Sequence, residues 1–220
     1  MAQKLNGNEL QSCYNGSQEI DKIMYGSSLV WENIKLIDLG TAQSFNIKNY
    51  TSNWANLTVN NFFMVGNSNR ASINGIDRDD TIVYVTNDWE KSYSNGTLTF
   101  RIKIFDSEGR NAYAGVHAVM VEKIDKLIHL GSGQSFNAKS YSNWQDFTYK
   151  NFLMLKPSGY ANHGVRTPES WSAYTEVLGS YSNGTFICKF YYRWDHENTG
   201  STTPRIEADN MDVYLFPKKI

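Results

Sequence analysis

The chain has little charge imbalance, few prolines, two cysteines and no long apolar run, and these shortages exclude several classes of protein. Its 220 residues carry 21 Lys and Arg against 22 Asp and Glu, a net charge of −1. Nucleic-acid binding needs a basic face, so we expect no nucleic-acid partner. No apolar run approaches the roughly 18 to 20 residues of a membrane helix, so we expect no membrane insertion. The first residues lack the apolar core of a secretion signal, so we expect no cleaved leader.

The two cysteines, Cys13 and Cys188, lie far apart in the sequence. A chain without a leader folds in a reducing compartment, where thiols stay unpaired. We therefore expect two free thiols, with Cys188 packed in a strand. A single long-range disulfide is the alternative.

Residues that favour turns and strands dominate what is present. There are 23 Asn, 21 Ser, 14 Thr, 16 Gly and 14 Tyr, but only 4 Pro. Asn, Gly and Ser favour turns, whereas Tyr, Phe and Thr favour strands. With 40% hydrophobic and 14% aromatic residues, the chain has enough apolar surface to fold. The composition predicts an all-β protein with many turns.

An internal repeat organises the chain. Residues 36–65 read LIDLGTAQSFNIKNYTSNWANLTVNNFFMV, and residues 127–155 read LIHLGSGQSFNAKSYSNWQDFTYKNFLML. With Thr51 treated as a one-residue insertion, 17 of 29 aligned positions are identical. A second shared block, SYSNGT, occurs at 92–97 and 180–185. A spacing of roughly 90 residues suits a complete β-sandwich better than a solenoid repeat.

We therefore predict three parts. Residues 1–33 form an N-terminal β-hairpin assembly segment, 34–125 a first β-sandwich domain and 126–220 a second domain that duplicates the first. Each domain is expected to hold seven or eight antiparallel strands in a jelly-roll-like or related sandwich. No flexible linker separates the copies, so we expect a fixed relation between them.

Strand signals recur within each copy. From Thr97 to Phe105, apolar residues at every second position predict a strand with one buried face. The Asn-Gly pairs at Asn95 and Asn183 predict type I′ hairpin turns, because that turn needs two residues with positive φ. Residues 81–86 and the region near 171–177 predict further strands.

The segment from Glu19 to Glu32, EIDKIMYGSSLVWE, resembles a short module of tail and other virion proteins of bacteriophages that infect Gram-positive bacteria. The tandem Leu-Gly…Gln-Ser-Phe-Asn copies are similar in general character to β-rich phage baseplate, tail-tip and head-fibre domains. The resemblance implies a virion structural or adsorption protein, often homotrimeric and sometimes carrying a carbohydrate-binding domain. It implies no catalytic residues.

No motif for catalysis, metal binding or a cofactor stands out, so we expect none of the three. The four histidines have no zinc spacing, and His117 and His129 are interpreted as ordinary structural or surface residues. The acidic stretch from Asn74 to Asp80 is interpreted as a solvated turn, with a Ca²⁺ loop as the alternative. A glycosidase or lyase would need Asp195, His196, Glu197 and Glu169 in one pocket.

Residues shared by the copies are expected to maintain the fold, Trp54 and Trp144 among them. Binding residues are expected where the copies differ, in two loop-like stretches, 156–172 and 194–205. The candidate saccharide ligands there are Tyr160, His163, Arg166, Trp171, Trp194, Asp195 and His196. The alternative is that these side chains pack on their own domain.

The sequence therefore predicts a non-enzymatic virion protein, associated with the tail or baseplate, which attaches by weak binding of host cell-surface saccharide. One alternative is a purely structural component, such as a capsid decoration, head fibre or collar protein, without glycan binding. Another is a β-sandwich glycan-active enzyme. Expected partners are other virion proteins, further copies in a homo-oligomer, assumed to be a trimer, and host cell-wall saccharide.

Overall fold

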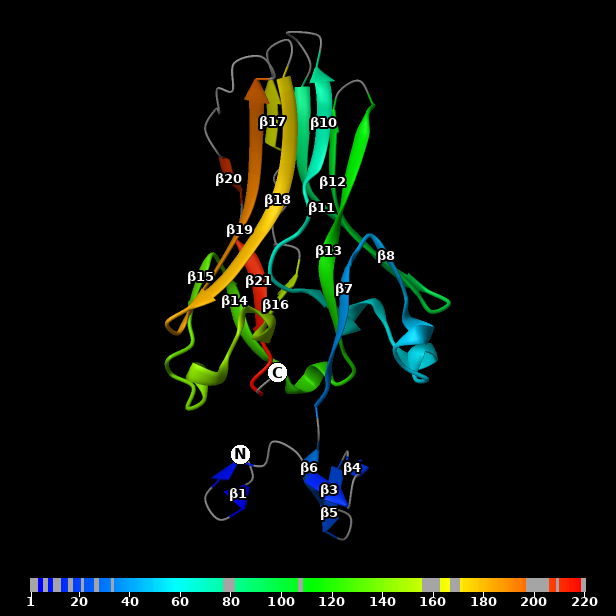
Figure 1. Cartoon of the computed structure of the whole chain (residues 1–220), viewed down its shortest axis with the longest axis vertical. Helices are drawn as coiled ribbons and strands as arrows, with labels where there is room; N and C mark the ends of the chain where they lie inside the picture. The colour runs from blue at the N-terminus through cyan, green and yellow to red at the C-terminus, as the bar shows by residue number, and fades with distance from the viewer. Residues whose placement is uncertain are drawn as a thin grey trace.

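The computed structural model is built almost entirely from antiparallel β-strands, as the composition predicts (Figure 1). It describes residues 4–5, 8–9, 13–15, 18–20, 22–25, 28–32, 34–76, 82–106, 109–155, 163–166, 171–196, 206–208 and 210–218. Side chains are described within 34–73, 89–106, 109–155, 175–191 and 210–218.

The first repeat contributes seven described strands and the second contributes eight, which agrees with the expected number. Those of the first are β7 (Leu36–Ala42), β8 (Ser44–Asn46), β9 (Phe62–Met64), β10 (Ala71–Ile76), β11 (Ile82–Ser94), β12 (Thr97–Asp106) and β13 (Asn111–Val121). Those of the second are β14 (Ile128–Gly133), β15 (Ser135–Asn137), β16 (Phe152–Leu155), β17 (His163–Arg166), β18 (Trp171–Ser182), β19 (Thr185–His196), β20 (Ile206–Ala208) and β21 (Met211–Leu215).

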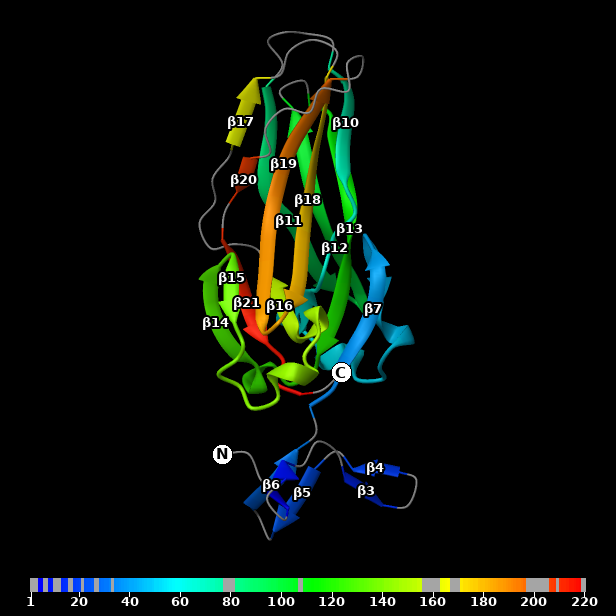
Figure 2. The same ribbon diagram turned by 60° about the vertical axis from the view of Figure 1, so that its left-hand side comes forward.

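These strands form two sheets. The larger runs β14-β21-β16-β9-β13-β12-β11-β17, with β7 added on β13 and β8 on β12. The smaller runs β10-β18-β19-β15, with β20 added on β19. The long strands of the two sheets run side by side along the upper body (Figures 1 and 2). A mostly apolar core fills the space between them.

The sheets do not follow the boundary between the repeats, because each repeat lends a strand to the other. Strand β10 of the first repeat pairs with β18 of the second, with Ser72 opposite Tyr174. Reciprocally, β17 of the second repeat pairs with β11 of the first, with Val83 opposite Val165. A third link joins β9 to β16 at Met64 and Met154. The assignment of each repeat to a domain of its own stays a prediction, but the two share both sheets.

The alternating pattern of β12 determines which of its faces is buried. Leu98, Phe100, Ile102 and Ile104 are all fully buried, while the residues between them are partly exposed. This confirms the period of two read from the sequence, since neighbouring side chains of a strand point to opposite faces. In the smaller sheet, β19 also buries every second side chain, namely Phe186, Cys188 and Phe190.

Both Asn-Gly turns have the conformation that the sequence predicts. Asn95 and Gly96 have φ of 48° and 79°, and Asn183 and Gly184 have φ of 46° and 76°. Two successive residues in the left-handed region give the tight turn that joins two long strands.

Two matching capping motifs attach one 3₁₀ helix of each repeat to the end of its last strand. Thr58 and Asn61 form a capping box around η3 (Val59–Asn61), and Thr148 and Asn151 form another around η6 (Tyr149–Asn151). The Nδ2 of Asn61 donates to the carbonyl oxygen of Val121 at 2.9 Å. A buried side-chain amide that donates to a backbone carbonyl in this way stabilises the packing of the 3₁₀ helix against the strand.

The N-terminal strands form three separate two-stranded ladders, whereas the sequence predicted one β-hairpin segment. These are β1 (Lys4–Leu5) with β2 (Asn8–Glu9), β3 (Cys13–Asn15) with β4 (Gln18–Ile20), and β5 (Lys22–Tyr25) with β6 (Ser28–Glu32). Asn15 pairs with Gln18 in the second ladder, and Tyr25 pairs with Ser28 in the third. The first ladder is too short to leave an alternating pattern. Figure 1 places these strands at the end of the molecule opposite β17.

Candidate functional site

Six of the seven candidate saccharide ligands lie in strands, where the sequence analysis expected loops. His163 and Arg166 are the ends of β17, Trp171 begins β18, and Trp194, Asp195 and His196 end β19. Their side chains, and the whole of Tyr160, lie outside the described residues. For His163 and Arg166 the expectation of a loop was wrong because β17 forms by pairing with the other repeat. For Trp194, Asp195 and His196 it was wrong because β19 continues to His196 by pairing with β18, which begins at Trp171, where the sequence had also predicted a strand.

The strand register nevertheless gathers these six positions in two places at one end of the body. In the smaller sheet, Trp171 lies opposite His196, and Trp194 lies two residues further along the same strand. In the larger sheet, His163 and Arg166 pair with Val85 and Ile82. Figures 1 and 2 show both places at the end of the long strands away from the N-terminal ladders.

His117 and His129, interpreted from the sequence as ordinary structural or surface residues, each lie within hydrogen-bonding distance of an aspartate. His117 Nε2 lies 2.7 Å from Asp38 Oδ1, and His129 Nε2 lies 2.7 Å from Asp212 Oδ1. Asp38 also accepts from Lys150 Nζ at 2.7 Å and from the backbone N–H of Gly40. Partial burial raises the pKa of Asp38, but these hydrogen bonds outweigh it and lower the pKa to about 2.

The repeated tryptophans pack against the fold, as expected from their presence in both copies. Trp54 and Trp144 contact the main core, and the ammonium groups of Lys48 and Lys139 lie over their rings. Tyr93 donates to the carbonyl oxygen of Trp54 at 2.6 Å, and Tyr181 does the same to Trp144 at 2.7 Å.

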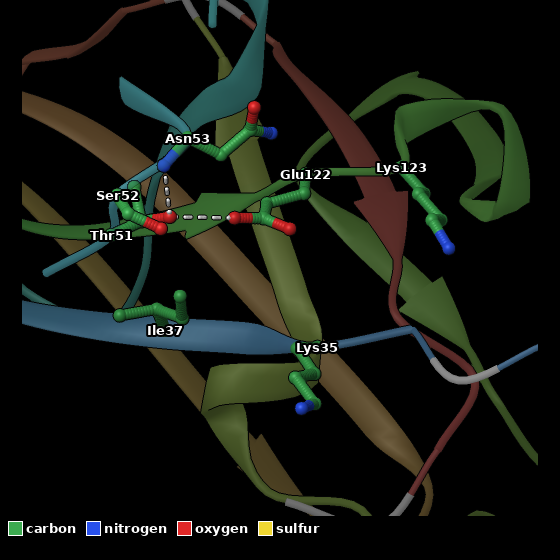
Figure 3. A pocket seen from close by; sticks show the side chains of 7 residues that line it. All are labelled: Lys35, Ile37, Thr51, Ser52, Asn53, Glu122 and Lys123. Carbon is green, nitrogen blue, oxygen red and sulfur yellow. Dashed lines mark hydrogen bonds between the residues drawn. The ribbon is translucent and has the colours of Figure 1, made fainter. Parts of the chain in front are cut away.

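A polar cavity of about 430 Å³ is lined in part by the residues that directly precede Trp54 in the sequence (Figure 3). It is lined by Lys35, Ile37, Thr51, Ser52, Asn53, Glu122 and Lys123. Three of them come from the segment between η1 (Ile47–Asn49) and η2 (Trp54–Asn56), and Glu122 directly follows β13. Ile37 lies on β7 below them (Figure 3).

Thr51 joins the two sides of this cavity. Its hydroxyl donates to Glu122 Oε1 at 3.0 Å and accepts from the backbone N–H of Asn53 at 3.1 Å. Thr51 is the residue that the second repeat lacks. The sequence analysis set it aside as an insertion, and that insertion was the signal that pointed to the cavity.

The second repeat is built differently at the matching position. Pro217 aligns with Glu122, and Asn143, the counterpart of Asn53, donates through its Nδ2 to the carbonyl oxygen of Pro217 at 3.1 Å. Without the extra threonine and the carboxylate, the amide spans the space directly. The cavity is therefore built in part by residues that the second repeat does not share.

A second, more apolar hollow of about 370 Å³ lies on the outer face of the smaller sheet. It is lined by Asn67, Leu178, Gly179, Ser180, Ile187, Lys189 and Tyr191. Ile187 is 42% exposed. In the first repeat Glu90 stands at the position of Leu178, and it accepts from Arg101 at 2.6 Å.

A buried thiol and the candidate metal loop complete the inventory of reactive groups. Cys188 is a free, buried cysteine, as expected, and burial raises its pKa to about 12. The side chain of Cys13 and the acidic stretch up to Asp80 lie outside the described side chains. Among the side chains that are described, no cluster of His, Cys, Asp and Glu could hold a metal ion.

The four residues that an enzyme would need in one pocket are also outside the described side chains, with Glu169 and Glu197 outside the described backbone as well. None of the helical segments in the described ranges has the length and apolar character needed to cross a membrane.

Comparison of the chain with protein-family models, with curated proteins and with solved structures finds no match in any of the three.

Proposed function

We propose that this chain is a non-enzymatic protein of a bacteriophage particle, associated with the tail or baseplate, which contributes to attachment by weak binding of host-surface saccharide. The sequence resemblance between residues 19 and 32 and virion modules supports the particle assignment. The near-neutral charge favours a hydroxyl-rich ligand over a phosphate backbone.

One observation carries the attachment role. The strand register brings the unrepeated positions Trp171, Trp194 and His196 together at one end of the body. Aromatic rings beside hydrogen-bonding side chains are suited to sugars, because they offer both an apolar surface and polar partners. The N-terminal ladders, at the other end in Figure 1, are proposed to join this protein to other virion proteins or to further copies of itself, as in a trimer.

The test is binding of purified host cell-wall polysaccharide to the full chain and to Trp171→Ala and Trp194→Ala. Tyr149→Ala is the matched control, since Tyr149 is an exposed aromatic residue outside this region. Both tryptophan variants should lose binding, and the control should keep it. Absence of binding by the unaltered chain at millimolar saccharide would refute the attachment role.

The apolar hollow on the smaller sheet favours a second candidate, a purely structural virion component. Exposed Ile187 and its neighbour Leu178 could be covered by an adjacent subunit, because removing apolar surface from water favours association. This role predicts a stable oligomer without saccharide affinity. Light scattering of the full chain, with and without residues 1–33, separates the two modes of assembly: assembly through the apolar hollow survives the deletion, whereas assembly through the N-terminal ladders does not.

A further inference from the structure

The polar cavity of the first repeat has the size and chemistry of a small-ligand site separate from the attachment region proposed above. Its volume of about 430 Å³ lies in the range of roughly 300 to 1,000 Å³ that is usual for small-molecule sites. The side chains around it carry hydroxyl, amide, carboxylate and ammonium groups, with one aliphatic side chain, Ile37, on its floor (Figure 3).

Several hydrogen-bonding groups remain for a ligand. Glu122 uses Oε1 to accept from Thr51, and its Oε2 has no partner among the described residues. Asn53 accepts from Asn56 through Oδ1, which leaves its two Nδ2 hydrogens for other acceptors. Ser52 is exposed at the same edge, so its hydroxyl can donate or accept.

The charges around the cavity are mixed, and this selects among ligands. An anion would lie beside the carboxylate of Glu122, and a cation would lie beside the ammonium groups of Lys35 and Lys123. Each would meet a like charge at close range, which is unfavourable. A neutral hydroxyl can donate to the carboxylate of Glu122 and accept from the Nδ2 of Asn53, so several hydroxyls on one ring satisfy both groups.

We propose that this cavity binds a neutral saccharide ring, held by Glu122, Asn53 and Ser52 against the aliphatic floor of Ile37. The site belongs to the first repeat alone, because Thr51 is inserted there and Glu122 is replaced by Pro217 in the second repeat. It does not depend on the attachment function proposed for the other end of the molecule.

The experiment measures binding of methyl α-glucopyranoside, methyl α-galactopyranoside and N-acetylglucosamine to the full chain by NMR titration. At least one should bind, with shifts concentrated in the amides of residues 51–53 and 122. Glu122→Gln should weaken that binding by roughly tenfold, the usual effect of losing a hydrogen bond to a charged group. Deletion of Thr51, which gives the first repeat the length of the second, should abolish it.

The matched control is Ser142→Ala, which alters the second-repeat counterpart of Ser52 and should leave binding unchanged, whereas Ser52→Ala should weaken it. Melting temperatures close to that of the unaltered chain show that the variants fold, and Glu122→Gln keeps the side-chain volume if the deletion does not fold. Binding that Glu122→Gln leaves unchanged overturns the proposal. So does failure of all three sugars at tens of millimolar.

Two further arms test the choice of ligand and of site. Glucuronate and glucosamine carry the same ring with a negative or a positive charge, and both should bind more weakly than the neutral sugars. Tighter binding of either overturns the assignment of a neutral ligand. Trp171→Ala and Trp194→Ala should not affect these titrations. If they abolish binding while Glu122→Gln does not, the sugar is bound at the attachment region and this inference fails on its own.

Discussion

His117 Nε2 lies 2.7 Å from Asp38 Oδ1, and the second repeat makes the same contact with the two residue types exchanged. There His129 occupies the position of Asp38, and Asp212 occupies the position of His117, again at 2.7 Å. The pair joins the first strand of each repeat to its last, β7 to β13 and β14 to β21. The contact is kept although the two residue types have exchanged strands, which indicates that the link between these strands matters more than which strand carries which residue.

Asp38→Asn should remove a pH-dependent part of the stability. The pKa of Asp38 is lowered from its ordinary value of 3.8 to about 2, so the unfolded chain binds this proton more tightly than the folded chain does. Its contribution is complete above pH 3.8 and is lost as the pH falls through about 2. The difference in unfolding free energy between the unaltered chain and Asp38→Asn should therefore shrink over that interval, as measured by urea titration.

The control for this experiment is Asp125→Asn, which changes an exposed carboxylate whose ion pair with Lys126 spans 3.2 Å. It should alter stability much less, because exposed ion pairs contribute little. A constant difference between the unaltered chain and Asp38→Asn from pH 5 to pH 2 would contradict the assigned role of Asp38.

The features that the sequence predicted are those that depend on neighbouring residues. The alternation of β12 and the positive φ of Asn95 and Gly96 follow from local patterns, because period and turn geometry are encoded within a few residues. The exchange of β10 and β17 was not predicted, since a strand's pattern does not say which repeat it will pair with.

The candidate site was predicted only in part for the same reason. The unrepeated tryptophans were identified by comparing the copies, and Thr51 was visible in that comparison as an insertion. Its hydrogen bond to Glu122 was not foreseeable, because 71 residues separate the two along the chain. Only the approach of η1 and η2 to the end of β13 brings them together.

Lys91→Met should stabilise the protein at neutral pH. The Lys91 ammonium lies 5.7 Å from the ring centroid of Phe63 and 5.5 Å from that of Phe100, and no carboxylate among the described residues pairs with it. Burial lowers its pKa from 10.5 to about 8, so between those values the unfolded chain binds more protons. The stability of the unaltered chain should therefore rise with pH across that interval, relative to Lys91→Met.

Chemical denaturation at pH 7 and pH 10 measures this difference directly. The advantage of Lys91→Met should be larger at pH 7 than at pH 10, because the unaltered chain must bury a charge only at the lower pH. The control is Lys139→Met, which removes an exposed ammonium above Trp144. An equal gain at both pH values would show that packing rather than charge burial is responsible.

Gly96→Ala should be more destabilising than a glycine replacement that meets no neighbour. At Gly96, φ is 79°, and an added Cβ would lie 2.6 Å from Lys48 Cε and 3.2 Å from Trp54 Cε3. The left-handed conformation alone costs about 1 to 2 kcal/mol, and displacing Lys48 from the tryptophan ring adds about 0.5 to 1 kcal/mol. We expect a loss of about 1.5 to 3 kcal/mol in the unfolding free energy.

Gly109→Ala separates these two effects, because Gly109 has φ of 84° and nothing within 4 Å of an added Cβ. Gly109→Ala should lower the unfolding free energy only by the cost of the left-handed conformation, about 1 to 2 kcal/mol. Equal losses at the two positions, measured by thermal denaturation, would mean that the contact with Lys48 and Trp54 contributes nothing.

Separate expression of residues 1–125 and 126–220 should yield two chains that fold only together. Each would lack the strand that the other lends, leaving an edge of β11 or β18 without its partner. Bare sheet edges expose unpaired backbone groups and promote association. Co-expressed fragments should therefore purify as a one-to-one complex, and single fragments should aggregate or self-associate by size-exclusion chromatography.

Side-chain contacts between the repeats explain why the two fragments should form a specific complex and not only a non-specific association of sheet edges. Ser68 and Asn67 of the first repeat bond to the backbone of β18: the N–H of Val177 donates to Ser68 Oγ at 2.8 Å, and that of Gly179 donates to Asn67 Oδ1 at 2.9 Å. Gly179→Val in the second fragment would drive its side chain into the backbone of Gly66, only 2.9 Å from an added Cβ. That variant should fail to form the complex, whereas Ser142→Ala should not. Two fragments that each unfold cooperatively as monomers would show instead that each repeat is complete in itself.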